Sequence, residues 1–175
     1  MTKNNHHNHS DLPGTALSEK DFEGRKILFL HDELQGEFAW DTGIAISRYL
    51  AAFKDGILLG AHCRKCRRIV IPPRTVCEIC FIPMHDFVPL KNTGTVNTFS
   101  LCYVTWDVKR IKEPEIPAVI EIDGASPLHG IMHKLGEVNP EMVHIGMRVQ
   151  AVWKPSEERT GSVTDILYFK PLEEV

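Results

Sequence analysis

Short alternating runs of apolar and polar residues dominate the chain from about residue 95 onward. The runs are rich in Thr, Val and aromatic residues, and they are separated by Gly, Pro, Asn and Asp. Alternation with a period of two is typical of strands that bury one face. The pattern predicts five strands, at residues 95–106, 117–123, 128–133, 147–153 and 164–169.

A short helix is predicted between the third and fourth of these strands. It opens at Asn139-Pro140, because proline is favoured at the start of a helix, and it closes at Gly146. Five strands with one short helix in this place follow the order of an OB-fold, a small and partly open barrel. The pattern therefore predicts a mainly β chain with a five-stranded OB-fold barrel over residues 91–175.

The period changes to that of a helix earlier in the chain. Ile46, Leu50 and Phe53 recur at helical spacing, and Asp41 is a candidate N-cap for a helix that runs to about Phe53. Gly56 suits the left-handed conformation that ends such a helix. The apolar stripe favours packing against a core, and an interface with a partner is the alternative interpretation.

Two shorter apolar runs flank a polar turn in RKILFLHDELQGEFAW, residues 25–40, and predict a hairpin. A two-stranded hairpin is marginally stable alone, so it should pack on its own domain or on another protein. Phe29, Phe38 and Trp40 are the candidate anchors of such an interface. Residues 1–20 are polar and predict a flexible tail.

Four of the five cysteines cluster in CRKCRRIVIPPRTVCEIC, at Cys63, Cys66, Cys77 and Cys80. Two C-x2-C pairs at this spacing predict a metal site, and two disulfides or a redox pair are the alternatives. A chain without an apolar export signal favours metal over disulfides, and no βαβ alternation supports a thioredoxin-like site. The fifth cysteine, Cys102, lies within a predicted strand and is expected to be a buried, inert thiol.

Zinc is the favoured metal, because four thiolates complete its tetrahedron. A rubredoxin-type iron site uses the same geometry and remains the alternative. Four protein ligands leave no position for water or substrate, so the ion is expected to be structural. The segment is too short to bury a stabilising core unaided, and metal binding would supply that stability.

Charge is unevenly spread along the chain, whose formal net charge is −3. Residues 57–90 contain two acidic residues and five basic ones, which are Arg64, Lys65, Arg67, Arg68 and Arg74. These side chains either offset the formal −2 charge of a zinc tetrathiolate or face an anionic ligand or partner. Because the basicity is confined to this segment, the sequence shows no broad nucleic-acid footprint.

The composition, with 43% hydrophobic and 25% charged residues among 175, is that of an ordinary globular protein. One or two small domains fit this length, and a large catalytic scaffold does not. No apolar run approaches the roughly 18 residues that a membrane-spanning helix needs, and a cytoplasmic location is expected. The sequence contains no G-x-S-x-G, H-E-x-x-H, P-loop or G-x-G-x-x-G motif, so catalysis by the chain alone is not predicted.

Several stretches together resemble a known family. They are YLAAFKDGILLGAHCRKC, IPPRTVCEIC, LKNTGTVNTFSLCYV, IPAVIEIDGA and GMRVQAVW, and they extend over about residues 44–172. In this order they resemble the acyl-CoA-associated OB-fold family with a rubredoxin-like zinc ribbon. Three parts are expected: a tail, hairpin and helix at 1–56 that bind a partner, a zinc ribbon at 57–90, and the OB-fold at 91–175. Residues 1–43 lie outside the resemblance and are interpreted as an added interface arm. Many such ribbons place glycine where Arg67 and Phe81 stand, so both residues need a left-handed or adjusted backbone.

Members of this family are typically small, non-catalytic subunits of thiolases, ketoacyl-CoA synthases, or steroid side-chain aldolases and hydratases. The resemblance therefore implies a zinc-binding accessory subunit of a CoA-thioester enzyme, with a thiolase-like catalytic subunit as partner in a hetero-oligomer. A benzoylsuccinyl-CoA thiolase of aromatic degradation is a specific case. The candidates for contacts with the phosphates of CoA are Arg64, Arg67, Arg68 and Arg74.

Two other classes of function are weighed against this hypothesis. A module for single-stranded nucleic acid is the first, because zinc ribbons and OB-folds both serve there. Its stacking residues would be Phe99, Tyr103, Trp106 and Trp153, but the acidic balance outside the ribbon argues against it. An independent enzyme is the second, and the sequence offers it no acid, base or nucleophile pair.

Overall fold

The computed structural model describes residues 18–24, 36 and 39–172. The hairpin expected at residues 25–40, with Phe29 and Phe38, lies almost entirely outside the described residues. The chain divides into two units, Met1–Ala39 and Trp40–Val175. In the first unit the structure describes one short helix, α1 (Glu19–Glu23).

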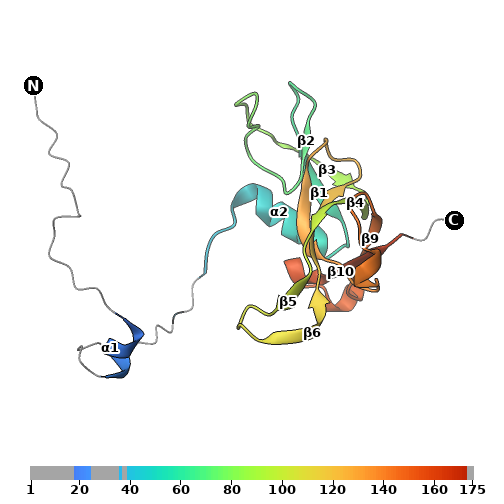
Figure 1. The fold of residues 1–175 in the computed structure, drawn as a ribbon. Coiled ribbons are helices and arrows are strands. Elements are labelled where there is room, and N and C mark those ends of the chain that lie inside the picture. Colours follow the sequence, from blue (N-terminus) through green and yellow to red (C-terminus); the bar gives the residue numbers. More distant parts are fainter. Residues whose placement is uncertain (1–17, 25–35, 37–38, 173–175) are drawn as a thin grey trace, which may run out of the picture. The chain divides into compact units, whose positions relative to one another are not determined.

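The second unit contains one α-helix, ten strands and three short 3-10 helices among its described residues (Figure 1). The α-helix is α2 (Gly43–Phe53), and the 3-10 helices are η2 (Pro140–Met142), η3 (Ser156–Glu158) and η4 (Val163–Asp165). The strands are β1 (Leu58–His62), β2 (Ile69–Val70), β3 (Asp86–Leu90), β4 (Thr93–Phe99), β5 (Cys102–Val104), β6 (Arg110–Glu115), β7 (Pro117–Ile122), β8 (Gly130–Lys134), β9 (Arg148–Trp153) and β10 (Ile166–Pro171). The chain is mainly β, which confirms the predicted fold class.

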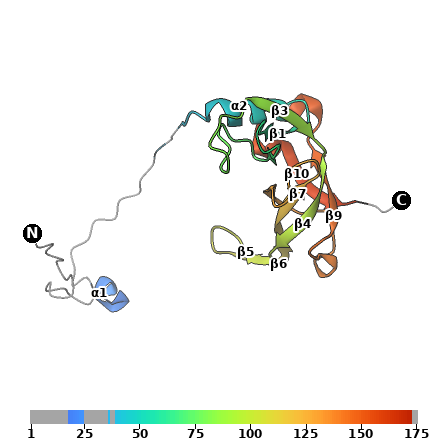
Figure 2. The same ribbon diagram turned by 90° about the horizontal axis from the view of Figure 1, so that it is seen from above.

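The strands form three antiparallel sheets. β2, β1 and β3 make a three-stranded sheet, and β10, β9, β4, β7 and β8 make a five-stranded sheet in that order (Figure 2). A bridge between Leu135 and Phe169 brings the two edges of the larger sheet together, and the Gly136 N–H donates to the Phe169 carbonyl at 2.9 Å. This partly closed sheet is the predicted OB-fold barrel. The remaining two strands, β5 and β6, form a separate hairpin sheet.

Alternating side chains fill the barrel. Ala118, Ile120 and Ile122 on β7 are buried while their neighbours are partly exposed, as a strand with one covered face requires. Phe169 on β10 is fully buried in the same core. Gly94 on β4 permits the close approach of β7, because a Cβ there would lie 2.4 Å from the Glu121 carbonyl oxygen.

Helix α2 packs into this core through Phe53 of the predicted stripe and through the neighbouring Tyr49, and Leu50 is partly buried against the same core. Tyr49 and Phe53 are buried, and the Phe53 ring meets the rings of Tyr49 and Trp153 edge-on, with centroids 4.6 and 5.1 Å apart. The stripe therefore packs against a core, as favoured above, because α2 is one wall of the barrel domain.

The ends of α2 are close to the expected ones. Thr42 occupies the N-cap position, one residue after the predicted Asp41, and the Gly43 N–H donates to the Asp41 carboxylate at 2.9 Å. After the helix, Gly56 has a φ of 70°, which confirms the left-handed conformation expected there.

Two expectations about regular structure are wrong. The strand expected over 95–106 ends at Phe99, because β7 begins at Pro117 and offers no partner further along. The chain continues as β5, which pairs with the unpredicted β6. The helix expected over about 139–146 is the single 3-10 turn η2, which Asn139 caps by accepting the Glu141 N–H.

Candidate metal centre and its charged surround

Two tight backbone turns hold the four cysteines. In the first turn the Arg67 N–H donates to the Cys63 carbonyl at 2.8 Å, and in the second the Phe81 N–H donates to the Cys77 carbonyl at 2.9 Å. Arg67 and Phe81 have φ values of 62° and 53°. Both residues therefore adopt the left-handed backbone expected from the absence of glycine at these positions.

The four sulfur atoms converge on one point. The sulfurs of Cys63, Cys66, Cys77 and Cys80 all lie within 4.8 Å of one another, and those of Cys66 and Cys77 are 3.7 Å apart. A tetrahedral zinc–thiolate site with bonds of about 2.3 Å has sulfur–sulfur edges of about 3.8 Å. A disulfide would need about 2.05 Å, and all five cysteines are free. The cluster thus has the dimensions of a metal site.

Protonation of the cluster depends on a cation. The backbone N–H of Cys66 lowers the pKa of Cys63 to about 7, whereas burial raises the pKa of Cys80 to about 12. Four adjacent thiolates repel one another, so they ionise together only around a positive ion. Zn²⁺ fits these residues and would organise the fold here, since four sulfur ligands leave it no open position.

A small core surrounds the sulfurs. Ala61, Val70 and Met84 are buried together with Cys63 and Cys77, separately from the barrel core. Cys66 is exposed at the tip of the first turn. With so few apolar side chains, this core is too small to hold the ribbon without another source of stability.

Three of the four candidate arginines pair with carboxylates of the ribbon. Arg64 holds Asp86 through two hydrogen bonds, of 2.5 and 2.7 Å. The guanidinium groups of Arg68 and Arg74 lie 2.9 and 3.6 Å from the two carboxylate oxygens of Glu78. Arg67 is exposed, and within the described part of the chain it has no ion pair.

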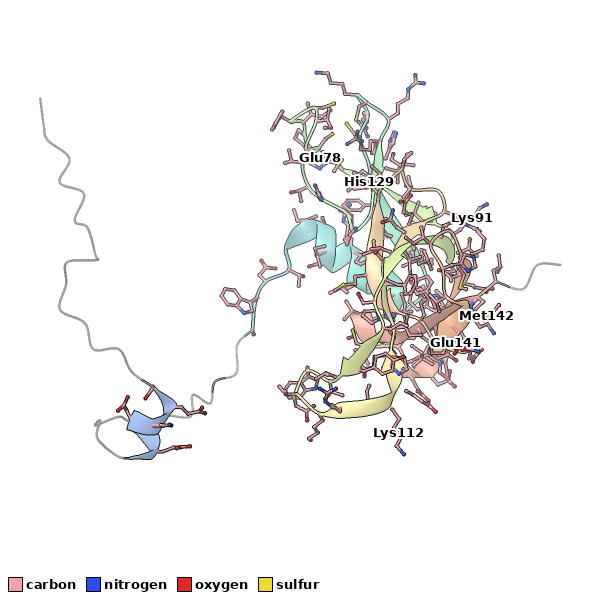
Figure 3. The ribbon with its side chains drawn as sticks, in the orientation of Figure 1. Glu78, Lys91, Lys112, His129, Glu141 and Met142 are labelled. Carbon is pink, nitrogen blue, oxygen red and sulfur yellow. The ribbon has the colours of Figure 1, made fainter. Side chains whose placement is uncertain are left out.

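Glu78 is the centre of this charged surround, and it lies beside His129 of the barrel (Figure 3). The His129 Nε2 atom is 3.6 Å from a Glu78 carboxylate oxygen. The Glu78 backbone N–H, and then Arg68, hold the pKa of Glu78 below its usual value. The hydrogen bond with Glu78, and further the sulfurs of Cys66 and Cys77, raise the pKa of Arg68. Arg68 is therefore the arginine for which the sulfur cluster is a neighbouring charge, and its neutralising role stays a prediction.

Sequence reasoning missed the partners of the arginines. The sequence pattern assigned no role to His129, Glu78 or Asp86. The charge count could have indicated this role. Glu78 and Asp86 are the only carboxylates among residues 57–90, and the same segment contains five basic residues.

A loop of the barrel fastens the ribbon in place. The Ser126 hydroxyl accepts the Ile69 N–H at 2.9 Å, and the Ser126 N–H donates to the Ile69 carbonyl at 2.9 Å. Ser126 lies between β7 and β8, and Ile69 lies on β2. The ribbon and the barrel are therefore joined here by one hydrogen bond between backbone groups and one from a backbone N–H to a side-chain hydroxyl.

The candidate base-stacking residues do not form one surface. Trp153 and Phe99 pack against the barrel core. Tyr103 and Trp106 are exposed on the β5–β6 hairpin and the turn that joins its strands. The partly buried Cys102 lies at the base of the same hairpin, outside the sulfur cluster.

Two known sequence families match the ribbon and the barrel. Residues 50–83 match the family described as ChsH2, rubredoxin-like zinc ribbon domain, and residues 87–154 match ChsH2, C-terminal OB-fold domain. The chain belongs to this ChsH2-type family. The two matches occur in the order that the resemblance implied, and together they cover more than half of the chain.

Three known proteins are similar to this chain over about two thirds of its length or more. A DUF35 domain-containing scaffold protein of Methanocaldococcus jannaschii is 29% identical over 119 residues, which are 66% of this chain and 82% of that protein. A DUF35 family protein of unknown function from Sulfolobus solfataricus has a TM-score of 0.59 at 21% identity, over 74% of this chain and 87% of that one. The structure described as Ltp2-ChsH2(DUF35) aldolase has a TM-score of 0.56 at 20% identity, over 77% and 98%. At these identities the two solved structures support the fold alone.

Proposed function

We propose that this ChsH2-type chain is a non-catalytic, zinc-binding accessory subunit of an enzyme that acts on CoA thioesters, with a thiolase-type subunit as its catalytic partner. The match of ribbon and barrel to the two ChsH2 domains is the observation that carries the proposal. One similar structure is described as an aldolase with a ChsH2(DUF35) component, and one relative is described as a scaffold protein. The more specific expectation of an aromatic-degradation thiolase stays a prediction.

The described side chains favour a structural role over catalysis. A four-sulfur site gives a metal ion no position for substrate. The Nδ1 atoms of His129, His133 and His144 each lie within hydrogen-bonding distance of a backbone carbonyl, at 3.0, 3.4 and 2.9 Å. None of these three contacts links a histidine to a hydroxyl or thiol nucleophile.

In this proposal Cys63, Cys66, Cys77 and Cys80 are the zinc ligands. The ion holds the two ribbon turns together, and the catalytic subunit carries the active site. No described helix has the length and apolar character that crossing a bilayer would require.

The test of the proposal is isolation of the tagged full-length chain from its own cells, followed by native mass spectrometry. We expect one dominant assembly with a larger chain, which peptide sequencing identifies as an enzyme of acyl-CoA chemistry. A monodisperse monomer in the native lysate would contradict the proposal.

The proposal also includes a contact with CoA. Arg67 is the candidate for this contact, because the other three arginines already pair with carboxylates. Arg64, Arg68 and Arg74 would have to exchange a carboxylate for a phosphate, whereas Arg67 is exposed and has no ion pair among the described residues. In the isolated complex, Arg67→Ala should weaken CoA binding by about tenfold or more, because a hydrogen bond to a charged group contributes roughly 1.5–3 kcal/mol. Arg64→Ala is the matched control. Equal CoA affinity in wild type and Arg67→Ala would exclude this contact.

A further inference from the structure

The β5–β6 hairpin exposes a concentration of apolar side chains. Trp106 is 96% exposed and Val108 is 82% exposed, both in the turn between the strands, and Tyr103 and Val104 on β5 are nearly half exposed. The hairpin extends away from the five-stranded sheet in both ribbon views (Figures 1 and 2). Such a cluster costs solubility unless something covers it.

The turn that presents Trp106 is ordered by its own hydrogen bonds. The Thr105 N–H donates to the Lys109 carbonyl at 2.9 Å, and the Lys109 N–H donates to the Thr105 hydroxyl at 3.1 Å. The Thr105 hydroxyl also donates to Asp107, whose carboxylate pairs with Lys109 at 2.6 Å. A large aromatic side chain on a preorganised turn loses little freedom on binding and is a typical interface anchor.

Both faces of the hairpin are bare. Tyr103 and Val104 are successive strand residues, so they point to opposite faces, yet both are exposed. A flat surface laid against one face would leave the other in water. The occupant must therefore enclose the end of the hairpin, as the walls of a cleft do.

The edge of β6 is unsuited to pairing with a second copy of the chain. Pro114 offers no backbone N–H, and four of the six residues of β6 are charged. If the β6 strands of two copies paired antiparallel about a twofold axis, the residue at the axis would lie opposite the same residue of the other copy. Lys112 or Glu113 at that position would therefore lie opposite a like charge. Docking through the apolar end of the hairpin, rather than strand addition, is consistent with this edge.

The charged residues of the hairpin indicate the charge expected at the rim of the partner's cleft. Arg110 and Lys112 are exposed close to the apolar end, and among the described residues neither has an ion pair. An acidic rim would complement them. An anionic lipid surface suits the hairpin less well, because the Asp107 carboxylate lies beside Trp106 at the turn.

We infer that the β5–β6 hairpin is the arm by which this chain docks its catalytic partner, with Trp106 seated in an apolar cleft whose carboxylate rim faces Arg110 and Lys112. The inference rests on the proposed function and names the surface that performs it. It assigns the anchoring role to Trp106, whereas Trp40, the described candidate from the N-terminal arm, serves as the comparison.

The test uses the full-length chain and the purified catalytic partner from the isolated complex. Trp106→Ala should weaken the affinity by about thirtyfold or more, the loss typical of a central aromatic anchor. Trp40→Ala compares the anchor considered for the N-terminal arm and should weaken the affinity less than Trp106→Ala does; a larger loss in Trp40→Ala would move the anchor to that arm. Met132→Ala, which removes a side chain of β8 that is 76% exposed, is the control and should leave affinity within about twofold. Arg110→Glu should slow association most strongly at low salt, because rim charges act on the rate of encounter. Hydrogen exchange of residues 102–115 should slow in the complex.

The outcomes separate the inference from the function on which it rests. Unchanged partner affinity in Trp106→Ala, with a complex still formed, overturns the docking arm and leaves the accessory-subunit proposal standing. Trp106-dependent binding to phosphatidylserine vesicles, or Trp106-dependent self-association, overturns it equally if partner affinity is unaffected. If the wild-type chain forms no complex, both proposals fail. A circular dichroism spectrum identical to wild type shows that a weakened variant is folded.

Discussion

Replacing Cys77 with serine should release the metal and loosen the ribbon while the barrel stays folded. Cys77 is fully buried, and its sulfur lies 3.7 Å from that of Cys66. A neutral, hard hydroxyl is a poor substitute for a thiolate ligand of zinc. Structural zinc contributes about 10–16 kcal/mol at neutral pH, so an even share for each of four ligands is about 2.5–4 kcal/mol.

The small core of the ribbon does not replace the full contribution of the bound ion. Its two larger fully buried apolar side chains are Val70 and Met84. At about 1.5–3 kcal/mol for each buried side chain, they supply about 3–6 kcal/mol, well below the contribution of the ion. Strand β1 should persist, because Leu58 at its start is buried in the barrel core.

Hydrogen exchange with peptide resolution, together with elemental analysis, measures both effects. Wild type should hold one zinc ion per chain, and Cys77→Ser should hold much less and lose protection over residues 63–86 but not 117–122. Cys102→Ser, which lies outside the sulfur cluster, should retain the metal and the protection. A metal-free Cys77→Ser variant with a fully protected ribbon would refute the reasoning. Iron in place of zinc would correct the identity of the ion.

Two further predictions concern the barrel. Phe53→Ala should lower the free energy of unfolding by about 3–5 kcal/mol, because it removes a buried ring and two edge-on aromatic contacts. Urea denaturation measures this loss, and a loss below about 1 kcal/mol would mean that α2 is not part of the core. Asp123→Asn should cost about 1–2 kcal/mol at pH 7, since the hydrogen bond with Arg148 holds the pKa of Asp123 at about 2. Because that pKa is depressed, the stabilisation is present above about pH 4 and is lost as pH falls toward 2. Stability curves of variant and wild type should therefore converge in acid, and a constant gap would contradict the assignment.

Local patterns in the sequence predicted much of the fold. Alternation placed the five barrel strands, and the helical stripe placed Leu50 and Phe53 against a core. The left-handed backbone at Arg67 and Phe81 followed from the resemblance to ribbons that place glycine at these positions. Each of these features is decided within a few residues, which is why a single sequence reveals it.

The features that escaped prediction depend on distant partners. The strand ends at Phe99 because β7 begins at Pro117, and nothing near Phe99 records that limit. Strand β6 is hidden by its charges and Pro114, since it has no covered face to impose alternation. Glu78 contacts Arg68 of the ribbon and His129 of the barrel, so only the folded chain brings these residues together.

Reconstitution of activity distinguishes an accessory subunit from an independent enzyme. The catalytic subunit identified in the complex is assayed on its acyl-CoA substrate with and without this chain, and the chain is assayed alone. We predict no turnover by the chain alone, and turnover by the catalytic subunit that depends on adding the chain in stoichiometric amount. Turnover by the isolated chain, or catalysis by the partner that is indifferent to its presence, would contradict the account.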